Sequence, residues 1–161
     1  MRPQAIPRTD AARGTKKWVQ CFSGEGRTGV TDEQMAVWNR AALERGGRTP
    51  RGGDAALAAL LHAHSLVMNG GVRHAVEVLE SRELEGACDR FRFFGFDEVA
   101  ALLERAAGGP WGERGDAAFD AEYARVIASD GAIIERFERH FFTHRQFYSP
   151  TDSPRSGPTP V

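Results

Sequence analysis

The stretch that decides the fold is SLVMNGGVRHAVEV, residues 65–78, where one helical pattern of apolar residues runs into another with no loop between them. Apolar residues recur every three to four positions on both sides of Asn69-Gly70-Gly71, as expected of helices with one buried face. Asn69 and Gly70 can take left-handed backbone angles, and Gly71 lets two helices meet without a side-chain clash. The sequence therefore predicts a tight structural corner at Asn69, Gly70 and Gly71 between two core helices.

The same periodicity continues toward the N-terminus and predicts two helices before the corner. Thr31, followed three residues later by Gln34, has the pattern of a capping box that opens a helix ending at Gly46-Gly47. Asp54 is expected to cap the second helix, which leads into the corner. The residues expected to face inward are Met35, Trp38 and Ala42 in the first helix and Leu57, Leu60, Leu61, His64 and Met68 in the second.

Toward the C-terminus, the apolar pattern predicts five helices after the corner. Gly95 suits the left-handed position that ends the fourth helix, with Phe96 folding back on its last turn. Asp97 is expected to start the fifth helix and Asp130 to cap the last one, and residues 110–115 are expected to form a loop before the sixth. The expected buried residues are Val72, Ala75, Val76, Leu79, Leu84, Ala87, Cys88, Phe91, Phe94, Val99, Leu102, Leu103, Ala106, Phe119, Tyr123, Val126, Ile127, Ile134, Phe137 and Phe141.

The whole chain has the composition of one globular domain, with 161 residues, 41% of them hydrophobic and 27% charged. Only Trp18–Phe22 is strand-like, and one short strand makes no sheet. We therefore predict a single all-α domain of six to seven packed helices over residues 17–148, with a flexible arm at 1–16 and a disordered, proline-rich tail at 149–161. No apolar run of bilayer length and no signal-peptide core are found, which predicts a cytoplasmic location.

The net charge of −1 is unevenly distributed along the chain. Residues 1–53 carry ten basic and five acidic groups, whereas residues 54–148 carry ten basic and sixteen acidic groups. Acidic residues bracket the boundary between the third and fourth helices, and we expect them to project along one edge as a partner-binding surface; the alternative is a solvated face that favours solubility. These residues are Glu77, Glu80, Glu83, Glu85 and Asp89.

Catalytic and metal-binding patterns are sparse. His140 and His144 are four residues apart and share a helix face, but protein zinc sites use three or four ligands and no third is evident. Cys21 and Cys88 form no disulfide framework, and Cys88 falls on an apolar stripe, where a cysteine is usually inert. We therefore predict no catalytic residue, no cofactor and no metal.

Two patterns point weakly to phosphate groups. Gly24, Gly26 and Gly29 have the spacing of a dinucleotide-binding loop, but the helix that follows opens with carboxylates and no βαβ unit surrounds it, so a glycine turn is expected. A set of arginines lacks both interleaved aromatic residues and a recognition helix, which predicts an arginine-rich linker and no direct binding of nucleic acid. These arginines are Arg40, Arg45, Arg48 and Arg51.

Two segments carry a family resemblance: VMNGGV at residues 67–72 and FGFDEVAALL at residues 94–103. With the residues around them, over roughly 54–145, they resemble the small all-helical bacterial DNA-mimic protein family. The resemblance implies a protein that binds other proteins: an acidic surface imitates DNA phosphates and occupies the DNA site of a transcription regulator.

Together these observations predict a non-enzymatic bacterial binding protein that engages a protein partner through an acidic helix surface, with a DNA-binding regulator as the partner the resemblance implies. Two alternatives remain open. One is an immunity-type protein that neutralises a toxin, and the other is a small metal-dependent enzyme that uses His140 and His144.

Overall fold

The computed structural model describes residues 31–109 and 111–151, and all regular structure in these residues is helical. The predicted all-α single domain is therefore confirmed. The arm at 1–16, the strand-like Trp18–Phe22 and the glycine motif lie outside the described residues. The helices are α2 (Asp32–Glu44), α3 (Gly52–Val78), α4 (Ser81–Phe93), α5 (Asp97–Ala107), α6 (Gly112–Val126) and α7 (Asp130–Thr143), followed by the short 3₁₀ helix η3 (Arg145–Phe147).

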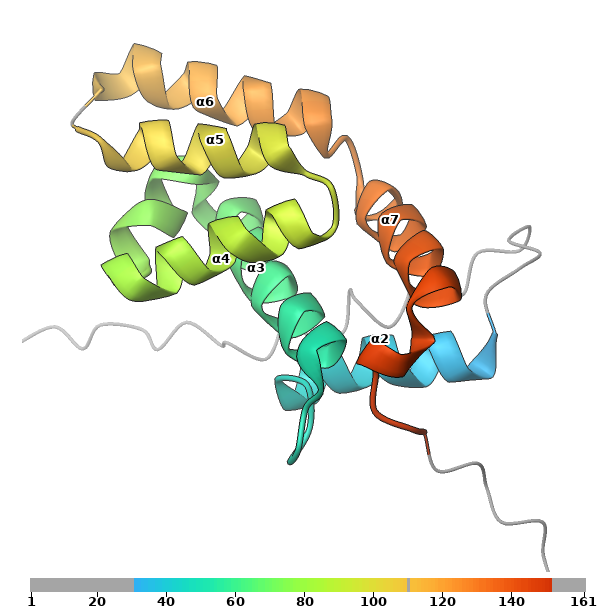
Figure 1. The fold of residues 1–161 in the computed structure, drawn as a ribbon. Coiled ribbons are helices and arrows are strands. Elements are labelled where there is room, and N and C mark those ends of the chain that lie inside the picture. Colours follow the sequence, from blue (N-terminus) through green and yellow to red (C-terminus); the bar gives the residue numbers. More distant parts are fainter. Residues whose placement is uncertain (1–30, 110, 152–161) are drawn as a thin grey trace, which may run out of the picture.

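Helix α3 is the central element, and it contacts α2, α4, α5, α6 and η3. Figure 1 shows α4, α5 and α6 stacked at one end of the molecule and α2 at the other end, with α3 and α7 running between them. The predicted second and third helices are the two parts of α3 on either side of its corner. The corner places the C-terminal part of α3 within the stacked end.

The core confirms most of the apolar stripes that the sequence predicted. Leu57, Leu60 and His64 on α3 are almost fully buried, as are Phe91 on α4 and Phe137 on α7. Some predicted core positions differ from those observed. In α2 the buried residues are Gln34, Val37, Trp38 and Ala41, so Gln34 and Ala41 are buried in place of their predicted neighbours Met35 and Ala42. The side chain of Met68, which was predicted to end the buried stripe of α3, is 62% exposed.

The corner lies at Gly70 and Gly71, as predicted, but the left-handed residue is a different one. Gly71 has φ +82° and ψ 176°, and Gly70 has φ −156° and ψ 15°; Asn69 stays helical. The left-handed backbone angles that the sequence allowed for Asn69 and Gly70 are thus not used there, and the positive φ falls on Gly71. A Cβ atom built on Gly71 would lie 2.8 Å from the Asp120 carboxylate. Both the positive φ and this close approach therefore require glycine.

Two helix ends formed by neighbouring residues agree with the predictions. The Gln34 side chain accepts the Thr31 N–H at 2.8 Å, and the Thr31 hydroxyl accepts the Gln34 N–H at 3.2 Å, which completes the capping box. At the end of α4, Gly95 has φ +75°, and the Phe96 N–H donates to the carbonyl of Phe91 at 2.8 Å. This is the predicted fold-back onto the last turn.

Three helix starts differ from the predictions. Asp54 is the third residue of α3, whose N-cap is Arg51, but its carboxylate still caps the first turn because it accepts the Arg51 N–H at 3.2 Å. Asp130 is the first residue of α7 and follows the N-cap Ser129. Helix α6 already begins at Gly112, so most of the loop predicted at 110–115 is helical. Both aspartates also make contacts with distant elements, Asp54 with Arg40 and Ser149 and Asp130 with His64.

Among the described residues, α3 is long and apolar enough to cross a membrane by length and composition, contrary to the expectation from the sequence. The helix is bent at Gly70-Gly71 and carries the fully buried polar side chains of Asp54 and His64. Core helices of soluble proteins often share this composition, and α3 packs against five other elements here.

Candidate functional site

The five acidic residues predicted to bind a partner lie around the junction of α3 and α4, and all are exposed. Glu77 is near the end of α3, Glu80 precedes α4, and the other three lie within α4. The Glu83 carboxylate accepts the backbone N–H of Glu80 at 3.1 Å, so it also holds the first turn of α4.

These residues do not form one continuous edge. Glu83 and Glu85 are two positions apart in a helix, which places them about 200° apart around its axis. Glu83 shares its flank with Arg90 and faces the first half of α3. Glu85 shares its flank with Arg92, which pairs with Glu104 on α5 at 2.7 Å. The prediction of a single edge is therefore wrong, because the helical period separates the carboxylates onto two flanks.

Arginines neutralise much of the acidic surface elsewhere. Carboxylates on α2, α5, α6 and α7 form surface ion pairs, which include Glu33–Arg145, Glu98–Arg125, Glu104–Arg92, Glu122–Arg105 and Glu135–Arg139. In contrast, Glu80, Glu83 and Glu85 form no ion pair with any residue of 31–109 or 111–151. Three carboxylates without ion pairs thus lie close together in the sequence at the beginning of α4, where Arg82 is the one basic residue in the run.

A groove of about 330 Å³, here called the junction groove, lies beside the same α3–α4 junction and between the facing ends of α5 and α6. Leu79, Leu84, Phe119 and the 52% exposed Trp111 supply its apolar lining. The rings of Trp111 and Phe119 pack edge to face with centroids 5.6 Å apart. Exposed aromatic residues of this kind are enriched at protein-binding surfaces.

The rim of the junction groove carries Glu77 and Asp116, and Arg73 connects them. The Arg73 Nε donates to Glu77 at 2.7 Å, and its Nη1 donates to Asp116 at 2.9 Å. Glu77 is therefore the member of the predicted acidic set that belongs to a groove with aromatic walls.

A larger hollow of about 380 Å³ lies between the α4–α5 turn and α7. Asp97, Glu98 and Glu135 line it together with Arg136 and Arg139. Its three carboxylates and two guanidinium groups leave a net charge of only −1, which is too little to select a ligand by charge.

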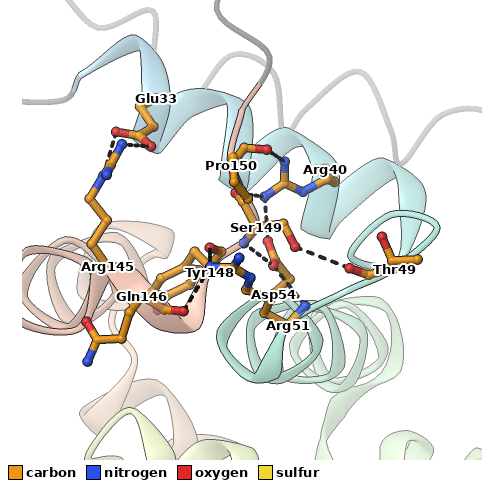
Figure 2. A network of polar contacts seen from close by, with 10 residues as sticks. All are labelled: Glu33, Arg40, Thr49, Arg51, Asp54, Arg145, Gln146, Tyr148, Ser149 and Pro150. Carbon is orange, nitrogen blue, oxygen red and sulfur yellow. Dashed lines mark hydrogen bonds and ion pairs between the residues drawn. The ribbon is translucent and has the colours of Figure 1, made fainter.

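A buried carboxylate joins α2, α3 and the C-terminal segment, as Figure 2 shows. Asp54 is fully buried; one of its oxygens accepts from Arg40 at 2.6 Å, and the other accepts the backbone N–H groups of Ser149 at 2.7 Å and Arg51 at 3.2 Å. Arg40 also donates to the Ser149 carbonyl at 2.9 Å. A buried carboxylate with an arginine partner and two backbone donors is well compensated, and it serves the fold.

The same network explains the arginines that precede α3. Arg51 donates to the backbone carbonyls of Gln146 and Tyr148 at 3.2 and 3.3 Å, and Figure 2 shows it beside Asp54. Arg40 and Arg51 are thus occupied in holding the C-terminal segment. The predicted boundary between domain and tail at residue 149 is too early, because Ser149 packs against α2 and α3.

A second buried network connects α3, α6 and α7. His64 is 1% exposed; its Nδ1 lies 2.7 Å from the Tyr123 hydroxyl, and its Nε2 lies 3.1 Å from the Asp130 carboxylate. Because a carboxylate only accepts, Nε2 carries the proton, and Nδ1 accepts from the hydroxyl of Tyr123. Burial lowers the pKa of His64 below its usual value, which favours this neutral form.

His140 and His144 lie in an aromatic cluster, where their rings stack and each contacts a hydroxyl group. The two rings stack with centroids 4.6 Å apart, His140 Nδ1 lies 2.9 Å from the Tyr148 hydroxyl, and His144 Nδ1 lies 2.7 Å from the Thr143 hydroxyl. Among the described residues, no group of three or more His, Cys, Asp or Glu side chains is arranged to hold a metal ion.

Cys88 is buried on α4, as its apolar neighbours predicted, and its thiol points to the carbonyl of Ala100 at 3.7 Å. Burial raises its pKa to about 11, so the reactive thiolate is disfavoured. Cys21 lies outside the described residues.

Sequence reasoning missed Trp111, Asp116 and Arg73 as site residues. A half-exposed tryptophan after Gly108-Gly109 is the signal that could have drawn attention to this segment, since tryptophan is enriched at binding surfaces. Comparison of the chain with protein-family models, with curated proteins and with solved structures gives no match.

Proposed function

We propose that this protein is a non-enzymatic, cytoplasmic bacterial binding protein that engages a protein partner through the acidic surface at the α3–α4 junction. The observation that carries the proposal is the group of exposed carboxylates Glu80, Glu83 and Glu85 at the beginning of α4, which lack ion pairs within the described residues. Glu80 lies in the chain between Leu79 and Ser81 of the junction groove, while Glu83 and Glu85 project from the two flanks of the same end of α4. Glu77 joins this surface to the groove, and Asp89 extends it along α4.

The surface suits a partner with a basic face. Opposite charges across an interface accelerate association and align the partners, while apolar contacts supply most of the affinity. The resemblance to the DNA-mimic family supports a DNA-binding regulator as this partner, because such a regulator already presents a basic surface.

The test begins with identification of the partner by cross-linking and affinity purification from the native cells. The partner is then titrated, at low and at high salt, against the wild type and the triple variant Glu80→Gln, Glu83→Gln and Glu85→Gln. Glutamine keeps the acceptor oxygen that Glu83 offers to the Glu80 N–H, so α4 should persist. We expect about tenfold weaker binding by the variant, mainly through slower association, and a smaller salt dependence.

A matched control changes Glu44, Glu98 and Glu135 to glutamine, which alters the net charge equally on other faces. This control should bind like the wild type. Equal losses in both triple variants would show that bulk charge and not this surface is responsible, and unchanged binding by the first variant would refute the proposed surface. A regulator or a toxin as the captured partner would decide between DNA mimicry and immunity.

A further inference from the structure

The junction groove has an arrangement of charge that favours one chemical group. Glu77 on α3 and Asp116 on α6 lie close enough for one guanidinium to bind both, with Arg73 donating at 2.7 and 2.9 Å through two different nitrogens. A planar guanidinium presents several N–H groups in a fixed fork, which suits two carboxylates better than the compact ammonium of lysine does.

Arg73 is held loosely in this position. Its side chain is 51% exposed and that of Glu77 is 58% exposed, so water competes for both groups. Exposed ion pairs of this kind are weak and are screened by salt. Another guanidinium can therefore replace Arg73 at little cost if it brings additional contacts.

The aromatic wall supplies such contacts. Trp111 is half exposed, and the guanidinium of Arg105 already lies over the ring of Phe119 at 5.8 Å. Aromatic faces attract guanidinium groups, and a tryptophan beside a hollow of about 330 Å³ can pack a large apolar side chain.

We infer that the junction groove binds an arginine of the partner together with a neighbouring large apolar side chain, and that Arg73 occupies the arginine position in the free protein. The inference rests on the proposed function and specifies the partner's contact segment. Charge complementarity with Glu77 and Asp116 selects the arginine, and the apolar lining that includes Leu79 and Trp111 selects the apolar residue.

The test uses short synthetic peptides in which leucine alternates with arginine, with lysine or with glutamate. Binding is followed through the indole N–H resonance of Trp111, assigned with the variant Trp111→Phe, in the full-length protein. The arginine peptide should shift this resonance and bind more tightly than the lysine peptide, with an affinity that falls as salt rises. The glutamate peptide should not bind.

Two variants test the carboxylates and the exchange with Arg73. The double variant Glu77→Gln and Asp116→Asn should weaken the arginine peptide by about tenfold, because both acceptors lose their charge. Arg73→Gln frees the two carboxylates and should tighten binding several-fold. Arg92→Gln is the matched control, since it breaks an arginine–carboxylate pair with Glu104 outside the groove, and it should change nothing.

Binding of the glutamate peptide as tightly as the arginine peptide would overturn the inference, as would an unmoved Trp111 resonance or an Arg73→Gln variant without tighter binding. With the natural partner the two proposals separate. If the triple variant of Glu80, Glu83 and Glu85 weakens binding while Asp116→Asn and Trp111→Phe do not, the acidic surface stands and the groove inference fails. If the reverse holds, the groove stands and the acidic surface fails.

Discussion

The carboxylate of Asp120 on α6 accepts a hydrogen bond from the backbone N–H of Val72 at 2.7 Å, where α3 turns its corner. Val72 is the first residue after the two non-helical glycines, and its N–H would otherwise lack an intrahelical partner. The negative charge of Asp120 also lies at the N-terminal, positive end of the helical segment that begins again after the corner. A residue 48 positions away thus completes the corner and ties α6 to it.

Replacement of Gly71 by valine should destabilise the domain by about 3 kcal/mol or more. The backbone has φ +82°, and an added Cβ would lie 2.8 Å from the Asp120 oxygens. Denaturant unfolding measures the change. Gly86→Ala in α4 is the control, because nothing lies within 4 Å of its added Cβ, and it should be neutral or stabilising. A melting temperature of Gly71→Val within about a degree of the wild type would contradict this prediction.

Asp120→Ala should cost about 1 kcal/mol of unfolding free energy, as the loss of a helix-capping side chain usually does. Asp120→Asn keeps an oxygen that can accept the Val72 N–H, so it should lose less. Thermal and denaturant unfolding of the two variants are compared side by side. Equal stability of the alanine variant and the wild type would show that the bond contributes nothing.

Asp54→Ala should be among the most damaging changes, at about 3 kcal/mol or more, because it leaves Arg40 and two backbone donors without their acceptor. Asp89→Asn on α4, whose side chain is 71% exposed, is the control and should have little effect. Both are measured by denaturant unfolding. If the two variants unfold alike, the network in Figure 2 has no stabilising role.

Stability should fall as the pH falls through the range below about 6.5, the usual pKa of histidine. The unfolded chain then takes up a proton at His64, whereas the folded protein, with its lowered pKa, does not until a lower pH. The contribution is thus complete above about pH 6.5 and is lost as the pH falls through the folded pKa. His140, whose pKa is lowered by burial and by His144, acts in the same direction.

The measurement is the unfolding free energy of wild type, His64→Gln and the control His62→Gln between pH 5 and 8. His62 is exposed, so its variant should retain the wild-type slope. The slope of His64→Gln should be smaller, and an unchanged slope would show that His64 does not control the acid sensitivity.

Treatment with a chelator should leave helicity and melting temperature unchanged. His140 and His144 supply at most two ligands, and each has a ring nitrogen engaged by a hydroxyl, whereas structural metal sites need three or four ligands. Stoichiometric zinc or iron in the purified protein, with a large fall in melting temperature on removal, would instead support the metal-dependent enzyme.

Local features of the fold could be predicted from the sequence because their partners are a few residues away. Thr31 and Gln34 close a capping box three residues wide, and Gly95 and Phe96 end α4 by contacts with its own last turn. The buried stripes follow from the helical period alone. The corner was located for a related local reason, since Gly71 has φ +82°, a backbone conformation that favours glycine.

The candidate site was predicted less well. The five acidic residues are exposed, as expected, but their order in the sequence did not reveal that α4 turns Glu83 and Glu85 to opposite flanks. The groove with Trp111 and Asp116 requires the ends of four helices to meet, and no local pattern encodes that meeting.

The sequence by itself determined the helical class, the position of the corner and most of the core, since apolar periodicity and glycine conformation act over a few residues. Only the tertiary structure decided the roles of Asp54, Asp120 and Asp130. Each resembles a local helix cap or a surface charge in the sequence, yet their partners Ser149, Val72 and His64 are 95, 48 and 66 positions away. A polar side chain bonds to whichever donor the packed helices bring near it, and that choice is made by the packing of the apolar faces.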